Sequence, residues 1–374
     1  MKRVLIDNLK NIAGWRTREK LVVIAVDDYG NVRLDSAAAR DKLEGAGVDV
    51  INRFDRLDSL ETRQDLEALF GVLSSVSDAR GRPAVMTPYA LCANPDIEAI
   101  RERPDRYAYE LLPRTFDRLS DRQPDAYRGA WALWREGIEK RFLRPQFHGR
   151  EHFNVGLLER KLKTRDRTLM TNLENNSLAA IGDEPSMPGV GFTHAFGVWD
   201  RAEVARHGEI IESGLSLFEE VFGFASTTFT PPALQLHPDL YALVESLGVR
   251  AIDKPLRCVR RIDRDTMRRE WNTLGIARGQ HHVSIVRNVV FEPTRDLRFD
   301  SVRLALEQAA AAFRWGKPAI ISTHRVNFCG HIEEENRKHG LDALKRLLEG
   351  IVQRWPEVHF VGADDLADKV LESA

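Results

Sequence analysis

Short apolar runs that recur along the chain constrain its fold more than any other feature. Between them lie longer polar or amphipathic stretches, of which 301–316 and 340–356 have helical periodicity and end near Gly or Pro. Strand-like runs that alternate with helix-like stretches predict an α/β fold with a parallel sheet. About eight such runs favour a (β/α)7-8 barrel over an open sheet. The runs, rich in Val, Ile and Phe, are LVVIAVDD (21–28), PAVMTPYAL (83–91), FLRPQFH (142–148), STTFTPPAL (226–234), VRAIDKP (249–255), HVSIVRNVVF (282–291), PAIISTH (318–324) and VHFVGADD (358–365).

The segment 93–141 departs from this alternation because it is highly charged and helical in pattern, with prolines as breaks. We expect it to form a helical insertion above the barrel, close to the end of the next strand. Residues 166–190 are rich in loop-forming residues and can form part of a lid or rim. The chain has no internal repeat and no linker long enough to separate independent units. Residues 1–374 are therefore expected to form a single domain.

Charge and cysteine content exclude several classes of function. Lys and Arg number 55 against 56 Asp and Glu, a net charge of -1, so bulk charge predicts no nucleic-acid and no membrane partner. Cys92, Cys258 and Cys329 form no C-x-x-C pair, which argues against a disulfide framework or a thiolate zinc site. The N-terminal residues lack an apolar stretch of signal-peptide length, and no apolar run is long enough to span a membrane. We expect a reduced, cytoplasmic, soluble protein, and the residues leave its oligomeric state open.

Asp27 and Asp28, which end the first apolar run, are the first candidates for chemistry. Neighbouring side chains on a strand point to opposite faces, but where the backbone turns at a strand end both can reach one cleft. Two carboxylates at a buried strand end are costly unless a cation neutralises them. In parallel α/β folds this edge is also where sites are built. The alternative is that one Asp caps the following helix or turn.

His148 and His152 lie four residues apart in PQFHGREHFN, at the end of another apolar run. In a helical turn residues i and i+4 share a face, so both imidazoles could converge on one ion. The spacing is that of the zincins, but Gly149 stands where those enzymes carry their catalytic Glu. Alone, such a pair more often consists of surface or core histidines. Together with the strand-end Asp pair it predicts a divalent metal site with two histidines, one carboxylate and open positions for water and substrate.

His324 ends the run PAIISTH and is the third candidate, because the near-neutral pKa of free histidine suits a general acid. The adjacent Arg325 and Asn327 are natural contacts for a substrate or for the site residues. In FTPPAL the Pro231–Pro232 pair should form a stiff edge to a cleft, and we assign Pro232 to substrate binding. The alternatives are a rim histidine without a chemical role, and a plain loop at the prolines.

The order of these motifs resembles the polysaccharide deacetylase family, the NodB-type carbohydrate esterases of the glycoside hydrolase/deacetylase superfamily. The resemblance spans roughly residues 20–330, with its specific content in four short motifs. It implies a distorted (β/α) barrel and one divalent metal ion, usually zinc. By matching position, Asp27 resembles the family's general base and His324 its catalytic acid, while Asp28, His148 and His152 resemble the metal ligands.

Two motifs depart from the family pattern. The family's Arg-x-Pro-Tyr is matched by TPPA (230–233), so the Arg that helps to position the base and the Tyr that helps to hold the oxyanion are both absent. Lys254 or Arg325 could substitute for the missing Arg. VDDYG also differs from the usual Thr-Phe-Asp-Asp-Gly and is closer to the Asp-Asp-Phe-Gly of the YdjC-type chitooligosaccharide deacetylases.

The resemblance and the candidate residues together predict a metal-dependent hydrolase that removes N-acetyl groups from an amino-sugar-containing saccharide. One alternative is a metal-dependent hydrolase of another amide, ester or glycosidic bond. A second is a non-catalytic carbohydrate-binding protein on a degenerate barrel. Trp131, Trp134 and Trp199 could provide sugar-stacking faces, although buried core positions are the commoner outcome for Trp. His194 could also lie near the site.

Overall fold

The computed structural model describes residues 2–373, and the side chains of residues 4–373. Seven of the eight apolar runs contain one strand each and the run 282–291 contains two; together with one further strand these nine form a single ten-stranded sheet. All neighbouring strands in it are parallel except β10 and β11. The spatial order is β10 (Gly275–Ile276), β11 (Val283–Ile285), β7 (Ala251–Asp253), β6 (Thr228–Phe229), β5 (Gln146–Gly149), β2 (Met86–Leu91), β1 (Leu21–Tyr29), β13 (Ala319–His324) and β12 (Val289–Val290), and β14 (His359–Phe360) also pairs with β1.

The sheet curls into a half-barrel because one stretch of chain contributes to both of its sides. β11 pairs with β7, whereas β12, which begins four residues after β11 ends, pairs with β13. Four residues of extended chain span at most about 14 Å. The two sides of the sheet therefore meet at residues 286–288, and the expected distorted (β/α) barrel is confirmed.

Strand β1 lies at the centre of this arrangement and every one of its residues is buried. Since successive side chains of a strand point to opposite faces, Val23 packs into one buried cluster and Ile24 into another. The cluster of Val23 includes Leu366 of α15 (Ala363–Glu372). A strand that is apolar on both faces needs cover on both, as parallel sheets require.

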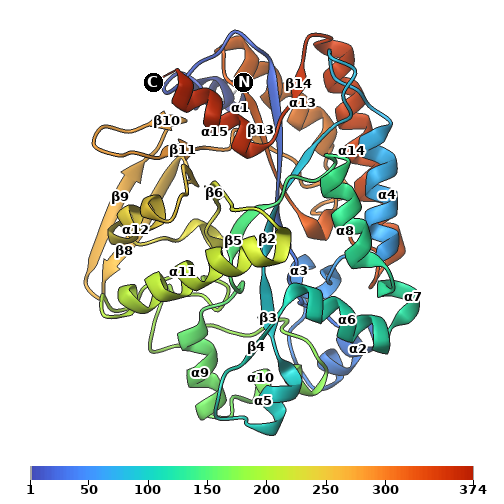
Figure 1. Cartoon of the computed structure of the whole chain (residues 1–374), viewed down its shortest axis with the longest axis vertical. Helices are drawn as coiled ribbons and strands as arrows, with labels where there is room; N and C mark the ends of the chain where they lie inside the picture. The colour runs from blue at the N-terminus through green and yellow to red at the C-terminus, as the bar shows by residue number, and fades with distance from the viewer. Residues whose placement is uncertain (1, 374) are drawn as a thin grey trace.

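Helices cover the sheet and fill the periphery of the molecule (Figure 1). None of those described in residues 2–373 is long and apolar enough to cross a membrane. Besides α15 they are α1 (Lys2–Leu9), α2 (Ala37–Gly45), α3 (Arg53–Leu57), α4 (Arg63–Ser74), α5 (Ile97–Glu102), α6 (Leu112–Arg122), α7 (Pro124–Tyr127), α8 (Ala130–Glu139), α9 (Val155–Lys163), α10 (Arg167–Glu174), α11 (Glu203–Phe222), α12 (Tyr241–Ser246), α13 (Ser301–Arg314) and α14 (Glu334–Arg354), with 3-10 turns η1 (Pro232–Leu234), η2 (Pro238–Leu240) and η3 (Arg325–Phe328).

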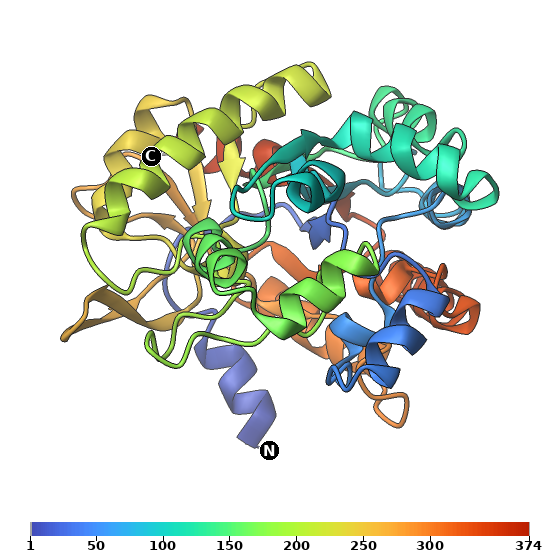
Figure 2. The same ribbon diagram turned by 90° about the horizontal axis from the view of Figure 1, so that it is seen from below.

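Two antiparallel pairs lie outside the main sheet, and the apolar pattern predicted neither. β3 (Ala93–Pro95) and β4 (Tyr109–Leu111) pair within the segment 93–141, which otherwise carries helices α5 to α8. β8 (Arg257–Asp263) and β9 (Thr266–Trp271) form a hairpin at one side of the molecule (Figure 1). At the N-terminal end of the chain, α1 projects from the body of the protein (Figure 2).

Candidate metal centre

The candidate residues meet in a pocket of about 730 Å³ at the carboxyl ends of the parallel strands. Asp27 is the register partner of His324, so the strand pairing alone places these two side by side. His148 follows from β5, two strands away from β1. This is the sheet edge at which α/β folds build sites.

Asp28 has a left-handed backbone, with φ of 76°, at the end of β1. The register between β1 and β2 shifts at the same point. In a regular strand Asp27 and Asp28 would face opposite sides. The left-handed residue interrupts that alternation, and both carboxylates line the same pocket. Asp is among the few residues other than Gly that tolerate this conformation.

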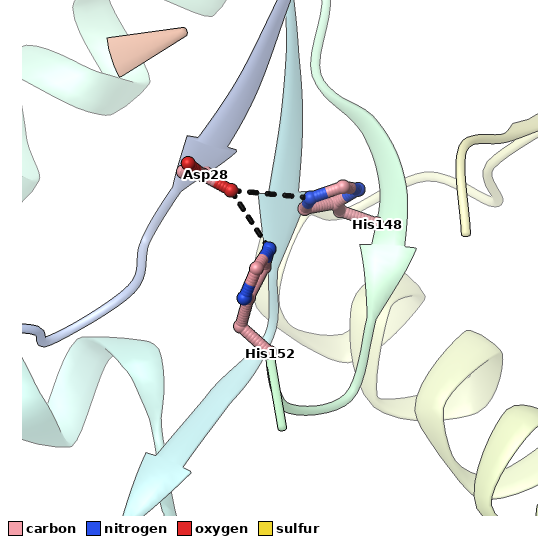
Figure 3. A group of neighbouring side chains, drawn as sticks. All are labelled: Asp28, His148 and His152. Carbon is pink, nitrogen blue, oxygen red and sulfur yellow. Dashed lines mark ion pairs between the residues drawn. The ribbon is translucent and has the colours of Figure 1, made fainter. Parts of the chain in front are cut away.

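Asp28, His148 and His152 converge with their ligand atoms all within 4.8 Å of one another (Figure 3). Asp28 Oδ1 lies 2.8 Å from His152 Nε2 and 3.5 Å from His148 Nε2, and all three side chains are buried. The two histidines do not share a helical turn. Instead β5 ends at Gly149, whose φ of 139° lets the chain bend, and His152 returns towards the strand end before α9 begins.

The hydrogen bonds of His148 favour a cation between these groups. Nδ1 lies 2.6 Å from the carbonyl oxygen of Thr230, which can only accept, so Nδ1 carries the proton. Nε2 is then an acceptor that faces the Asp28 carboxylate, and among the described residues this buried atom has no hydrogen-bond partner. Two facing acceptors repel each other unless a cation lies between them. The triad can therefore hold a divalent ion, in the two-histidine, one-carboxylate arrangement of catalytic sites.

The protonation states suit metal binding. Burial would raise the pKa of Asp28, but the attraction of His152, together with smaller contributions from other neighbours, outweighs burial and the pKa lies well below the usual value, so the carboxylate is ionised. Burial lowers the pKa of His152 in spite of the opposing charge of Asp28, which keeps the imidazole in its neutral, ligating form.

Asp27 is held by a residue that the sequence did not single out, Arg287. Both terminal nitrogens of Arg287 donate to the Asp27 carboxylate at 2.7 Å, and its Nε donates to Asp253 at 2.5 Å. Arg287 lies in the stretch between β11 and β12 where the two sides of the sheet meet. Burial raises the pKa of Asp27, but Arg287 outweighs this effect and the pKa lies below its usual value.

Arg287 therefore holds the Asp27 carboxylate in position, the task for which Lys254 or Arg325 was expected to replace the missing Arg. Lys254 lines the pocket, but its ammonium bonds to His282 instead. The signal that could have revealed Arg287 is its position in HVSIVRNVVF, since a charge inside a buried strand run needs a carboxylate partner.

His324 lies beside Asp27 in the pocket, with its Nε2 3.9 Å from Asp27 Oδ2. Its Nδ1 donates to Glu292 Oε1 at 2.6 Å, and the ring of Phe54 packs edge-on against it. Burial disfavours the cation, but the hydrogen bond and charge of Glu292 raise the pKa of His324 to about 9. The imidazole is therefore protonated at neutral pH, as a general acid must be.

The three residues predicted to contact the substrate, Arg325, Asn327 and Pro232, do not line the pocket. Arg325 is 1% exposed in the turn after β13, and its guanidinium pairs with Asp58 and Glu61 at 2.9 to 3.1 Å, so its role is structural. Asn327 is buried and donates to Glu292, which places it behind His324. Pro232 is buried in η1, and its neighbours Pro231, Ala233 and Leu234 line the pocket in its place.

Most of the residues that line the pocket are polar or charged; its apolar lining consists of aliphatic residues and two phenylalanines. None of Trp131, Trp134 and Trp199 is among the lining residues; Trp134 is buried and donates to Glu61. His194 lines a different cavity. Residues 178–183 of the loop-rich region do form part of the rim, through Leu178, Ala180, Ile181 and Asp183.

Comparison with known proteins gives similarity in structure alone. No protein-family model matches the chain, and no curated protein matches it significantly. A crystal structure described as a polysaccharide deacetylase from Mycobacterium smegmatis aligns with 96% of this chain, over 93% of its own length, at 11% sequence identity and a TM-score of 0.46. Another from Pseudomonas aeruginosa PAO1 aligns over 94% and 91%, at 12% identity and 0.45. The 4-alpha-glucanotransferase of Thermococcus litoralis aligns over 94% and 40%, at 9% identity and 0.47. Identities and TM-scores this low carry no argument about chemistry. What the site can do is therefore argued from the residues of this chain alone.

Proposed function

We propose that this chain is a metal-dependent hydrolase that removes N-acetyl groups from an amino-sugar-containing saccharide. The observation that carries the proposal is one pocket that combines three kinds of group. A metal-ligand triad, a carboxylate fixed by an arginine, and a histidine held protonated by a glutamate all face the same space. Hydrolysis of an amide needs these functions together: a Lewis acid, a base and an acid.

A divalent ion such as zinc, bound by Asp28, His148 and His152, supplies Lewis acidity towards a carbonyl oxygen and towards water. Asp27 acts as the base, because it is ionised and its carboxylate can take a proton from the attacking water. Arg287 orients that carboxylate through two parallel hydrogen bonds, a geometry that permits little rotation.

His324 acts as the acid and delivers a proton to the departing nitrogen. The base and the acid have environments that separate their pKa values: Asp27 lies beside a guanidinium and His324 beside a carboxylate. Such a pair of opposed environments is how acid and base roles are assigned within one site. Glu292 is a positioning residue, since it acts only through His324.

The proposal is tested by acetate release from N-acetylglucosamine oligomers, measured together with metal content. Asp27→Asn should keep the ion and lose activity, because it removes the base but no ligand. Full activity in this variant would refute the assignment of the base. Hydrolysis of another amide, ester or glycosidic substrate without acetate release would identify a different hydrolase. Saturable glycan binding by a metal-free, inactive protein would identify a carbohydrate-binding module.

A further inference from the structure

A second pocket, of about 640 Å³, lies beside β7 and away from the metal ligands. Its walls come from α12, from β9 and from the loop 277–281. Lys254, the residue directly after β7, lines both this cavity and the catalytic pocket. We name this cavity, with the lining residues used below, the β7 pocket.

Lys254 lies in the β7 pocket as a buried cation, with 2% of its surface exposed. Its Nζ is 2.6 Å from His282 Nε2 and 3.0 Å from Gln280 Oε1, and His282 Nδ1 is 2.5 Å from Glu245 Oε1. Because His282 donates from Nδ1 to the carboxylate, its Nε2 accepts and Lys254 is the donor. An ammonium has three N–H groups, and among residues 2–373 the third has no acceptor.

Burial lowers the pKa of Lys254 to about 8, so the side chain is still mostly charged at neutral pH. The ring of Tyr241 lies 4.3 Å from the ammonium. The Tyr241 hydroxyl, although buried, has no hydrogen-bond partner among the described residues. Buried polar atoms are seldom left unpaired. The β7 pocket therefore contains one N–H of Lys254 without an acceptor and, on Tyr241 beside it, a hydroxyl without a partner in the described part of the chain.

The charges around the β7 pocket favour an anion. Its two carboxylates are already paired, Glu245 with His282 and Glu270 with Arg260. Among the described residues Arg269 and Arg278 have no ion-pair partner. The four cationic lining residues are Lys254, Arg268, Arg269 and Arg278.

We propose that the β7 pocket binds a small anionic ligand through a phosphate or carboxylate group, with Lys254 as its buried cation and Arg269 and Arg278 as cations at its rim. Guanidinium and ammonium groups form strong, charge-assisted hydrogen bonds to both kinds of oxyanion. The site does not depend on the reaction proposed above. It adjoins that reaction's residues, because Asp253, next to Lys254 in the chain, holds Arg287.

The test is calorimetric titration of the metal-depleted full chain with inorganic phosphate and, separately, with malonate. Removing the ions prevents phosphate from binding through the metal centre. The probe that binds with the higher affinity identifies the preferred oxyanion. Arg269→Gln/Arg278→Gln should weaken its binding by about tenfold or more, since the loss of even one hydrogen bond between charged groups costs a factor of that order. Lys254→Met should abolish binding. Arg264→Gln, on the same hairpin but paired with Asp200 outside the pocket, should leave it unchanged.

Three results would overturn the proposal. The first is the absence of saturable binding of both probes. The second is binding that the double variant leaves unaltered; this variant changes exposed side chains, so it decides the question even where Lys254→Met fails to fold. The third is binding that is lost in His148→Ala, which would place the anion in the catalytic pocket.

Discussion

Replacement of Glu292 by Gln isolates the group that keeps His324 protonated. The Glu292 carboxylate accepts from His324 Nδ1 at 2.6 Å and is the largest influence that raises the pKa of this histidine to about 9. Gln keeps the shape and an acceptor oxygen but removes the charge. A buried opposite charge within hydrogen-bond distance shifts a pKa by about one to three units, so we expect the pKa of His324 to fall by about two, at a cost of roughly 2.7 kcal/mol to its protonated form.

The pH dependence of kcat measures this shift. A raised pKa means that the acid form is present below pH 9 and is lost as the pH rises through that value, so the wild-type rate should fall on the alkaline side near pH 9. In Glu292→Gln this alkaline limb should move down by about two pH units, with the metal content unchanged. Glu335→Gln, an equal loss of charge at an exposed site on α14, is the control and should not move it. An active Glu292→Gln enzyme with an unmoved alkaline limb would refute the assignment of His324 as the acid.

Three further predictions follow from the same contacts. His324→Gln should lower kcat by about a hundredfold or more and leave the bound ion in place, as rate and metal analysis together would show; loss of the ion would make His324 a ligand instead. Arg287→Met should leave Asp27 and Asp253 facing each other without a cation, so kcat and the melting temperature should both fall, and an unchanged kcat would contradict its positioning role. Arg325→Met should strand two buried carboxylates and lower the free energy of unfolding by about 3–5 kcal/mol in urea titrations, whereas a loss under about 1 kcal/mol would contradict its structural role.

The strands of the main sheet could be predicted from the sequence because each one is marked by a local run of apolar residues. A parallel strand covered on both faces must be apolar along its covered length, and residues 21–26 of β1 are the clearest case. The hairpin β8–β9 was missed for the same reason, since its residues are largely exposed and carry no apolar run. Asp28, His148 and His152 could be grouped from their types and their places at strand ends, but the bend that brings His152 back was not a helical turn.

Arg287 and Arg325 show what the sequence could not supply. Arg287 lies within the apolar run 282–291 and Arg325 directly follows the run 318–324, and the side chain of each is buried against two carboxylates. Which of them reaches the pocket depends on the closure of the sheet between β11 and β12, and on the 3-10 turn after β13 that directs Arg325 away. These are long-range features of the fold, and no spacing within a motif reports them.

Metal binding by Asp28, His148 and His152 is the central claim, and titration of the chelator-treated protein with zinc tests it most directly. The wild type should bind one ion per chain, while His148→Ala and Asp28→Asn should lose it and Asp27→Asn, one residue away, should retain it. Elemental analysis of the protein as purified provides an independent count. A wild type that binds no ion, or an ion retained equally in His148→Ala and Asp28→Asn, would contradict the account.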